Sequence, residues 1–182
     1  MRFPLLAACA VLLTSCSSDP APAPPPVAPV VSTLAAPAVS TPLRIDEYTG
    51  EPCLLITVDD LQVDYPVSDH ITSNGEDQCW YEATSSDYGT FQTRLSTDTS
   101  PLEAAYRNAS RYEHFEPTVI EGMPAVTAAE KRDGTDGCAI IVGTSPTQGF
   151  TLIRNPDKSP KPAADLCAPT LTYATNALKR LR

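Results

Sequence analysis

The sequence predicts an α+β fold: a single domain with a largely antiparallel sheet, three helices and two disulfides. Three observations predict this fold class. Strand patterns follow one another at hairpin-length connections, helical patterns open and close the globular region, and four cysteines lie within it. The chain has 182 residues and is 42% hydrophobic, which is enough for one core. A lipoprotein signal peptide and a proline-rich linker are expected to precede this domain.

Residues 1–15 have the features of a lipoprotein signal peptide. Arg2 supplies a positive charge, and an apolar run follows from Phe3 to Leu13. This run is too short to span a bilayer, which needs about 20 residues. It ends in Leu13-Thr14-Ser15-Cys16, which resembles the bacterial lipobox, where signal peptidase II cuts before an acylated cysteine. We therefore expect lipidation at Cys16; the alternative is a secreted protein cut at a small-residue site.

Residues 16–45 are predicted to be a disordered linker that begins at the lipidated cysteine. The stretch from Ser17 to Ile45 contains eight prolines and no glycine. Proline removes N–H donors and fixes φ, so this composition favours an extended polyproline II chain over packed helix or sheet. The expected role is a spacer that holds the domain away from the membrane. The alternatives are a proline-rich ligand for a partner domain and a site of O-glycosylation.

The globular domain is predicted over residues 46–182, which carry 11 basic and 21 acidic side chains and hence a net charge of −10. A capping box at Ser100 and Glu103, with Pro101 at the first helical position, begins the clearest helix, which is expected to reach about Phe115. The other predicted elements are, in order, a helical stripe over 54–61, strands over 79–83, 90–97, 118–120, 125–130, 139–143 and 150–154, and a last helix from near Pro169.

Four cysteines remain in this domain: Cys53, Cys79, Cys138 and Cys167. An even number in an exported domain implies two disulfides, for which three pairings exist. We predict Cys53–Cys167, which would tie the two terminal helices, and Cys79–Cys138, which would join two strands. The absence of any Cys-x-x-Cys pair removes support for a zinc ribbon or a thioredoxin-type redox site. Trp80, next to Cys79, is assigned to core packing.

Five features in this order resemble actinobacterial lipoproteins that carry the uncharacterised DUF3558 domain. They are Pro52-Cys53-Leu54-Leu55, Cys79 and Tyr81 around a tryptophan, Gly122-Met123-Pro124-Ala125, the strand Cys138-Ala139-Ile140-Ile141-Val142, and a cysteine that opens a C-terminal helix. The resemblance covers about residues 46–182 and the lipobox and linker before them. It implies an extracytoplasmic location and a shared fold, and it implies no activity because the family has none assigned.

Composition and motifs exclude several function classes. An acidic chain with a pI near 4.6 repels nucleic acid and anionic lipid headgroups, so no nucleic-acid partner is expected. The sequence has none of the common hydrolase, zinc-protease or nucleotide-binding motifs, and we predict no catalytic residue, metal or cofactor. His70 is expected in a solvated loop and His114 at a helix end. The segment from Asp133 to Gly137 is expected to be a hairpin turn.

The favoured functional hypothesis is a membrane-anchored, non-enzymatic binding or interaction module on the outer face of the cytoplasmic membrane, with an envelope protein as a possible partner. The alternative is a carrier of an apolar envelope ligand, in a cavity lined by Phe91, Leu95, Ile140 and Phe150. A third hypothesis, a hydrolase, would need His70 or His114 to meet a serine and an acid in one cleft.

Overall fold

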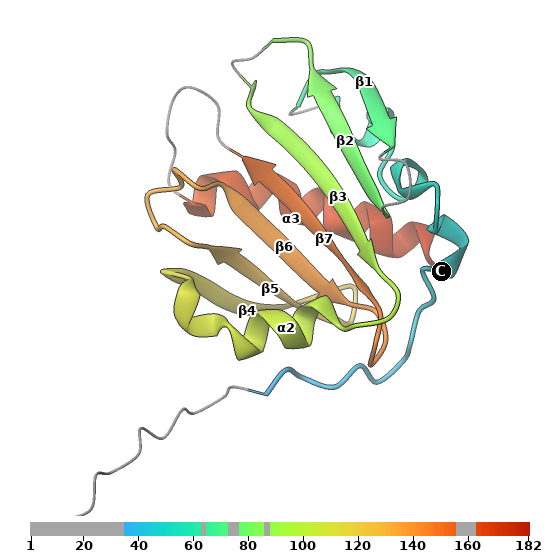
Figure 1. Ribbon diagram of the computed structural model, residues 1–182, viewed down its shortest axis with the longest axis vertical. Coiled ribbons are helices and arrows are strands. Elements are labelled where there is room, and N and C mark those ends of the chain that lie inside the picture. Colours follow the sequence, from blue (N-terminus) through green and yellow to red (C-terminus); the bar gives the residue numbers. More distant parts are fainter. Residues whose placement is uncertain (1–34, 63–64, 73–76, 86–87, 156–162) are drawn as a thin grey trace, which may run out of the picture. The chain divides into compact units, whose positions relative to one another are not determined.

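Seven strands form one antiparallel sheet in the order β1-β2-β3-β7-β6-β5-β4 (Figure 1). The computed structural model describes residues 35–62, 65–72, 77–85, 88–155 and 163–182. Cys16, the predicted signal peptide and the first part of the predicted linker lie outside the described residues. The strands are β1 (Val67–Thr72), β2 (Gln78–Ala83), β3 (Thr90–Ser96), β4 (His114–Ile120), β5 (Met123–Ala129), β6 (Cys138–Gly143) and β7 (Gly149–Asn155).

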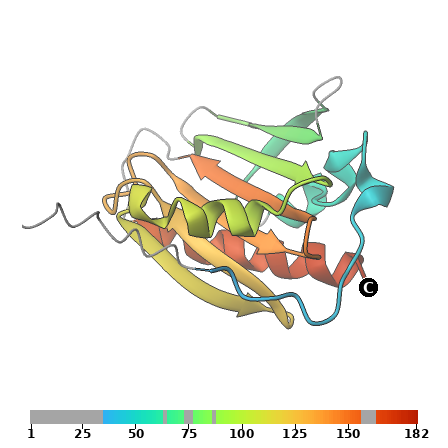
Figure 2. The same cartoon turned by 60° about the horizontal axis from the view of Figure 1, so that its bottom comes forward.

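Helices lie on both faces of the sheet. The long helix α3 (Ala163–Arg180) packs on β4, β6 and β7, while the short helix α2 (Pro101–Arg107) packs on β6 and β7 from the opposite face (Figures 1 and 2). We call the α3 face the back and the α2 face the front. The remaining helical pieces are α1 (Val58–Leu61) and the 3₁₀ turns η1 (Asp46–Tyr48), η2 (Pro52–Leu54) and η4 (Ala109–Arg111). No helix among the described residues is long and apolar enough to cross a membrane.

The core has two parts, one on each face. The larger part lies at the back, where Phe91 of β3 makes edge-on ring contacts with Tyr81 of β2 and Tyr173 of α3. The smaller part lies under α2 and consists of Leu102, Ala105, Tyr106, Val126, Ala128 and Ile141. Alternation along each strand sends successive side chains to opposite faces, so β5 and β6 contribute buried residues to both parts. This architecture confirms the predicted α+β class with three helices, an antiparallel sheet and two disulfides.

Several element boundaries differ from the prediction. Helix α2 ends at Arg107, because the Asn108 amide donates to the Ala104 carbonyl (2.7 Å) and the chain then turns into β4. His114 and Phe115 therefore begin a strand that pairs with β5, and the placement of His114 at a helix end was wrong. Helix α3 begins at Ala163 and contains Pro169 within its second turn. Strand β1 was not predicted, because its six residues show no clean alternation of apolar side chains.

The disulfide pairing also differs from the prediction: the bonds are Cys53–Cys79 and Cys138–Cys167, with Cα–Cα distances of 5.1 and 5.4 Å. The predicted Cys79–Cys138 bond would join β2 to β6, which are separated by β3 and β7. Three strand spacings amount to about 14 Å, well beyond the reach of a disulfide. Each observed bond instead fastens one helical segment to the strand beneath it, η2 to β2 and α3 to β6.

Residues 35–45, which the sequence analysis assigned to the linker, pack along the domain. This strap runs past α2 and reaches η1 (Figure 1). Val39 packs against the back core, the Leu43 amide donates to the Thr144 carbonyl (2.8 Å), and Ile45 is fully buried. Apolar side chains at these positions can bury surface although the segment is rich in proline, so the packed domain includes residues 36–45 of the predicted linker.

Candidate functional site

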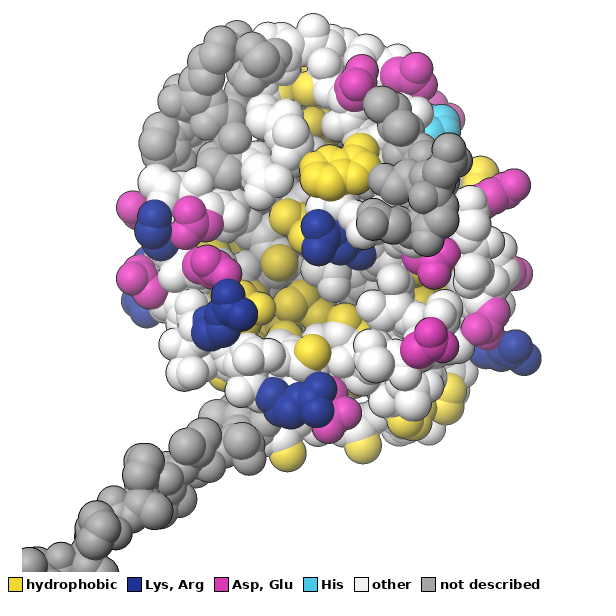
Figure 3. Space-filling model, in the orientation of Figure 1, with side chains coloured by type: hydrophobic (Ala, Val, Ile, Leu, Met, Phe, Trp, Pro, Cys, Tyr) yellow, Lys and Arg dark blue, Asp and Glu magenta, His cyan; other side chains and the backbone are white. Residues whose placement is uncertain are grey.

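The front of the sheet is only partly covered by helix. A helix with side chains is about 10–12 Å in diameter, whereas seven strands span about 29 Å. Helix α2 packs on β6 and β7, so the described elements leave β1, β2 and β3 uncovered on this face. Figure 3 shows the result: hydrophobic side chains are visible in a hollow of the front face, with most carboxylates around its margin. This surface is the candidate functional site.

Strand register places one row of side chains straight across the hollow. Trp80 pairs with Gln92, Gln92 with Ile153, and Ile153 with Ala139. Trp80 is 37% exposed, and it is a large aromatic side chain on a sheet face with no helix over it. Its neighbours on β2, Cys79 and Tyr81, point into the back core. The assignment of Trp80 to core packing was therefore wrong, and the alternation Cys79, Trp80, Tyr81 contained the signal that opposes it.

Polar side chains surround this row. The side-chain amide of Gln92 is almost fully buried and donates from Nε2 to the side-chain oxygen Oε1 of Gln78 at 2.6 Å. Arg94 pairs with Gln78 in the register and is exposed. Asn155 of β7 donates to the Thr90 hydroxyl of β3 at 2.8 Å. A buried amide that is fixed by a second amide holds its geometry, so the polar groups beside Trp80 are preorganised.

Two surface hollows extend this row into a groove. One lies beside the β2–β3 hairpin and is lined by Trp80 and Thr90; the other is lined by Ile153, Asn155, Ala139 and Tyr112. The Thr90–Asn155 hydrogen bond joins them. We call this surface the front groove and define it by Trp80, Thr90, Gln92, Tyr112, Ala139, Ile153 and Asn155. From β2 to β6 it crosses three strand spacings, about 14 Å.

Carboxylates stand at both ends of the front groove. Glu82 lines the hollow beside Trp80, and Glu130 and Asp136 line the hollow beside Tyr112. The latter two pair with Arg111 and Lys131, each at 3.6 Å. Between these ends the seven residues of the groove carry aromatic, amide, hydroxyl and aliphatic groups, and the exposed Arg94 on the adjacent row adds a positive charge. The arrangement can bind a ligand by stacking and hydrogen bonding, and it repels anions at its ends.

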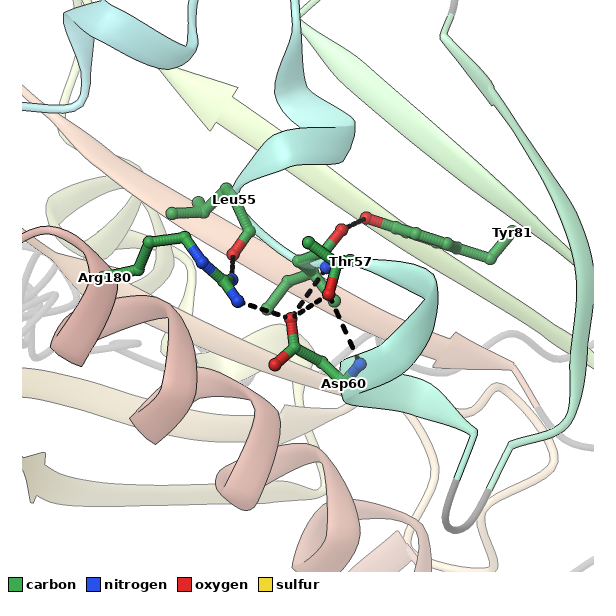
Figure 4. A network of polar contacts seen from close by, with 6 residues as sticks. Leu55, Thr57, Asp60, Tyr81 and Arg180 are labelled. Atoms are coloured by element: carbon green, nitrogen blue, oxygen red, sulfur yellow. Dashed lines mark hydrogen bonds and ion pairs between the residues drawn. The ribbon is translucent and has the colours of Figure 1, made fainter.

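The back of the domain contains a second polar cluster, shown in Figure 4. The Asp60 carboxylate accepts hydrogen bonds from the Thr57 amide and hydroxyl, both at 2.8 Å. It also forms an ion pair with Arg180 at 3.0 Å. Arg180 also donates to the Leu55 carbonyl, and the Tyr81 hydroxyl donates to the Ile56 carbonyl at 2.6 Å. This cluster is a clamp that holds the last turn of α3 against the start of α1.

The clamp has its own electrostatics. Burial opposes ionisation of Asp60, but the Thr57 hydrogen bonds and the Arg180 guanidinium outweigh it and hold the pKa below its ordinary value. Burial raises the pKa of the Tyr81 hydroxyl, which therefore stays protonated as a donor. The polar side chains of the clamp hydrogen-bond to other groups of the clamp, so we infer that the cluster stabilises the fold and does not bind a ligand.

The two histidines lie far apart. His70 is exposed, as predicted, but it lies on strand β1 and not in a loop. His114 lies on β4 with its Nε2 atom 3.1 Å from the Thr127 hydroxyl. These strands are the opposite edges of the sheet, about 29 Å apart by strand spacing, so the histidines belong to no common site. The structure also places the four carrier candidates, Phe91, Leu95, Ile140 and Phe150, within the back core.

The loop from Asp133 to Gly137 is a turn, as predicted. The Thr135 amide and hydroxyl donate to the Asp133 carboxylate at 3.0 and 2.8 Å, and Gly134 and Gly137 adopt positive φ. An alanine Cβ at position 137 would lie 2.4 Å from the Arg154 carbonyl oxygen, so glycine is required there. Within the described ranges, no group of three His, Cys, Asp or Glu side chains is arranged to hold a metal ion.

The comparisons with known proteins give a family and no activity. A family model described as a protein of unknown function, DUF3558, matches residues 5–180. The chain belongs to the DUF3558 family. No curated protein and no solved structure matches the chain significantly. For this DUF3558 domain, the front groove is thus a site that the structure defines and that sequence reasoning missed.

Proposed function

We propose that this DUF3558 protein is a membrane-anchored, non-enzymatic binding module of the extracytoplasmic face, and that it binds through the front groove. The observation that carries the proposal is Trp80, a large aromatic side chain exposed on an uncovered sheet face and bordered by preorganised amides. Exposed aromatic side chains of this kind are enriched at binding surfaces, because they bury large areas at low entropic cost.

The anchor and the location rest on the sequence and the cysteines. Two or three acyl chains at Cys16 would hold the chain stably on a membrane, since each buried CH₂ contributes about 0.8 kcal/mol. The two disulfides suit an oxidising compartment. A tether confines the groove near its partner and raises the effective concentration without new contacts.

Two arguments favour binding over catalysis. The histidines lie on opposite edge strands, and the front groove contains no side chain that ordinarily serves as a general base between its two acidic ends. The four residues of the alternative carrier hypothesis lie in the packed back core, so the apolar-ligand hypothesis receives no comparable support.

The test is site-specific photo-crosslinking of the full chain in its own cells. A photoreactive amino acid replaces Thr90 in the groove or, as the control, Val119, which is 69% exposed on the β4 edge. We expect a discrete adduct from position 90 that excess unlabelled chain competes away, and none from position 119. Equal adducts from both positions, or none from position 90, would contradict the proposal.

A further inference from the structure

We infer that the front groove binds a neutral carbohydrate chain, an assignment of ligand class that rests on the proposed function of this groove. The inference follows from three properties of the groove: an exposed indole face, a set of planar amides and hydroxyls beside it, and the distribution of charge along it.

The indole of Trp80 supplies the stacking surface. One face of a pyranose ring presents C–H groups, which pack on the apolar face of an aromatic ring, while its hydroxyl groups point outward. Trp80 is exposed on the sheet face at one end of the groove, and Tyr112 lines the other end. Tyr112 is held by stacking on Phe115, with ring centroids 5.9 Å apart. Two aromatic ends with polar groups between them suit a ligand made of linked rings.

The groups between the two aromatic side chains match sugar hydroxyls. A hydroxyl is both donor and acceptor, and so are the Asn155 amide and the Thr90 hydroxyl, which are held together by their own hydrogen bond. Gln92 is 2% exposed and donates to Gln78, so it supports the row from beneath and does not itself contact a ligand. Arg94 on the adjacent row adds a planar guanidinium that donates in pairs. Preorganised donors and acceptors lower the entropic cost of binding a polar ligand.

The charge of the groove favours an uncharged ligand. Glu82 stands at one end, and Glu130 and Asp136, which are paired with Arg111 and Lys131 at 3.6 Å, stand at the other; with Arg94 the surface around the groove carries charges of both signs. The net charge of −10 on the domain disfavours phosphate-bearing polymers, although their bases would also stack on Trp80. The same carboxylates accept hydrogen bonds from sugar hydroxyls. An uncharged polyhydroxylated chain fits both the middle and the ends of the groove.

A peptide fits less well. Extended peptides usually add to a sheet edge, where their backbone groups find partners. The front groove crosses the strands and offers no free backbone edge. The two edge strands also carry features that oppose pairing with an added strand: a register shift between Val67 and Asp69 in β1, and Pro117 in β4.

The test uses the full chain in detergent and its single tryptophan. Because Trp80 is the only tryptophan, its fluorescence and its indole N–H resonance report on the groove alone. The probes are neutral linear oligosaccharides of glucose, mannose, galactose and N-acetylglucosamine. We expect at least one to shift the emission of Trp80 saturably, with a dissociation constant of about 1 mM or below. Calorimetry with the same sugar then compares the variants.

We expect Trp80→Ala and Asn155→Ala to weaken binding at least about tenfold, Trp80→Phe to retain part of the affinity, and the control Val119→Ser to leave it unchanged. If no sugar binds but a peptide or protein is crosslinked at position 90, the carbohydrate assignment is overturned and the proposed function stands. If neither occurs, both are overturned. Sugar binding that Trp80→Ala does not weaken also overturns the inference.

Discussion

At the scale of single residues, Asp60 and Trp80 show two different uses of a polar or aromatic side chain. Asp60 is enclosed by Thr57 and Arg180, and its contacts are all made within the chain. Trp80 lies on the other face of the sheet with more than a third of its surface exposed. The first residue therefore contributes to stability, and the second is available to a partner.

Replacing Asp60 with asparagine is expected to lower the free energy of unfolding by about 1–3 kcal/mol at neutral pH, because a capping box and an ion pair are lost together. Urea denaturation measures this change. The matched control is Asp59→Asn, an exposed carboxylate in the same helical turn. An equal loss in both variants would show that the clamp contributes nothing specific.

The clamp also predicts a pH dependence. Because the pKa of Asp60 is lowered in the folded state, its contribution is fully present above the ordinary value of 3.8 and is lost as the pH falls through the lower folded value. The difference in unfolding free energy between the native chain and Asp60→Asn should therefore shrink below about pH 4. A difference in unfolding free energy that stays constant down to pH 2 would contradict the lowered pKa of Asp60.

At the scale of elements, each disulfide closes a short loop within one part of the sheet. The bonded cysteines are 26 and 29 residues apart, for which the chain-entropy model gives about 3–4 kcal/mol per bond. Opening either bond by a paired Cys→Ser substitution is expected to cost about that much stability, as measured by thermal denaturation.

The pairing itself has a simple chemical test. One disulfide lies entirely before residue 80 and the other entirely after residue 137. Denaturation and proteolysis after Lys131 should therefore separate the two halves of the chain without any reductant. Mass spectrometry of the fragments shows the result. Halves that stay joined until a reductant is added would contradict the pairing Cys53–Cys79 and Cys138–Cys167, because both of the other two pairings cross the cleavage site.

The strap is a further element with a measurable contribution. Ile45, the last residue of the strap, is fully buried in the back core, so Ile45→Ala should destabilise the domain by about 2–4 kcal/mol. Leu54→Ala, a truncation at a residue that is 51% exposed, is the control and should cost much less. Chemical denaturation of the two variants compares them. An equal loss of stability in the two variants would show that Ile45 does not contribute to the core.

Local patterns predicted the elements that have strong local signals. Ser100, Pro101 and Glu103 began a helix where the structure has one, with the Ser100 hydroxyl accepting from the Glu103 amide at 3.1 Å. Non-local features were missed, because they depend on the order of strands in the sheet. The disulfide pairing and the exposure of Trp80 both follow from the placement of β7 beside β3, which joins residues about 60 positions apart in sequence.

At the scale of the whole molecule, the proposed function combines a lipid anchor at Cys16 with a binding surface on the front of the sheet. The anchor makes a prediction of its own. Cys16→Ala should move the protein from the membrane fraction to the soluble fraction of its cells, because the acylated thiol is removed. Cys9→Ala, within the apolar run, is the control. Retention of Cys16→Ala on membranes would refute lipidation as the anchor.

The measurement that tests the binding role of the front groove most directly is fluorine NMR of the full chain labelled with fluorotryptophan. The spectrum contains one resonance, from Trp80. It is compared between membranes isolated from the native cell and vesicles of the extracted lipid alone. We predict a shifted or broadened resonance in the native membranes, because the groove is occupied there. An identical resonance in both samples would contradict the conclusion that this face of the sheet binds a partner.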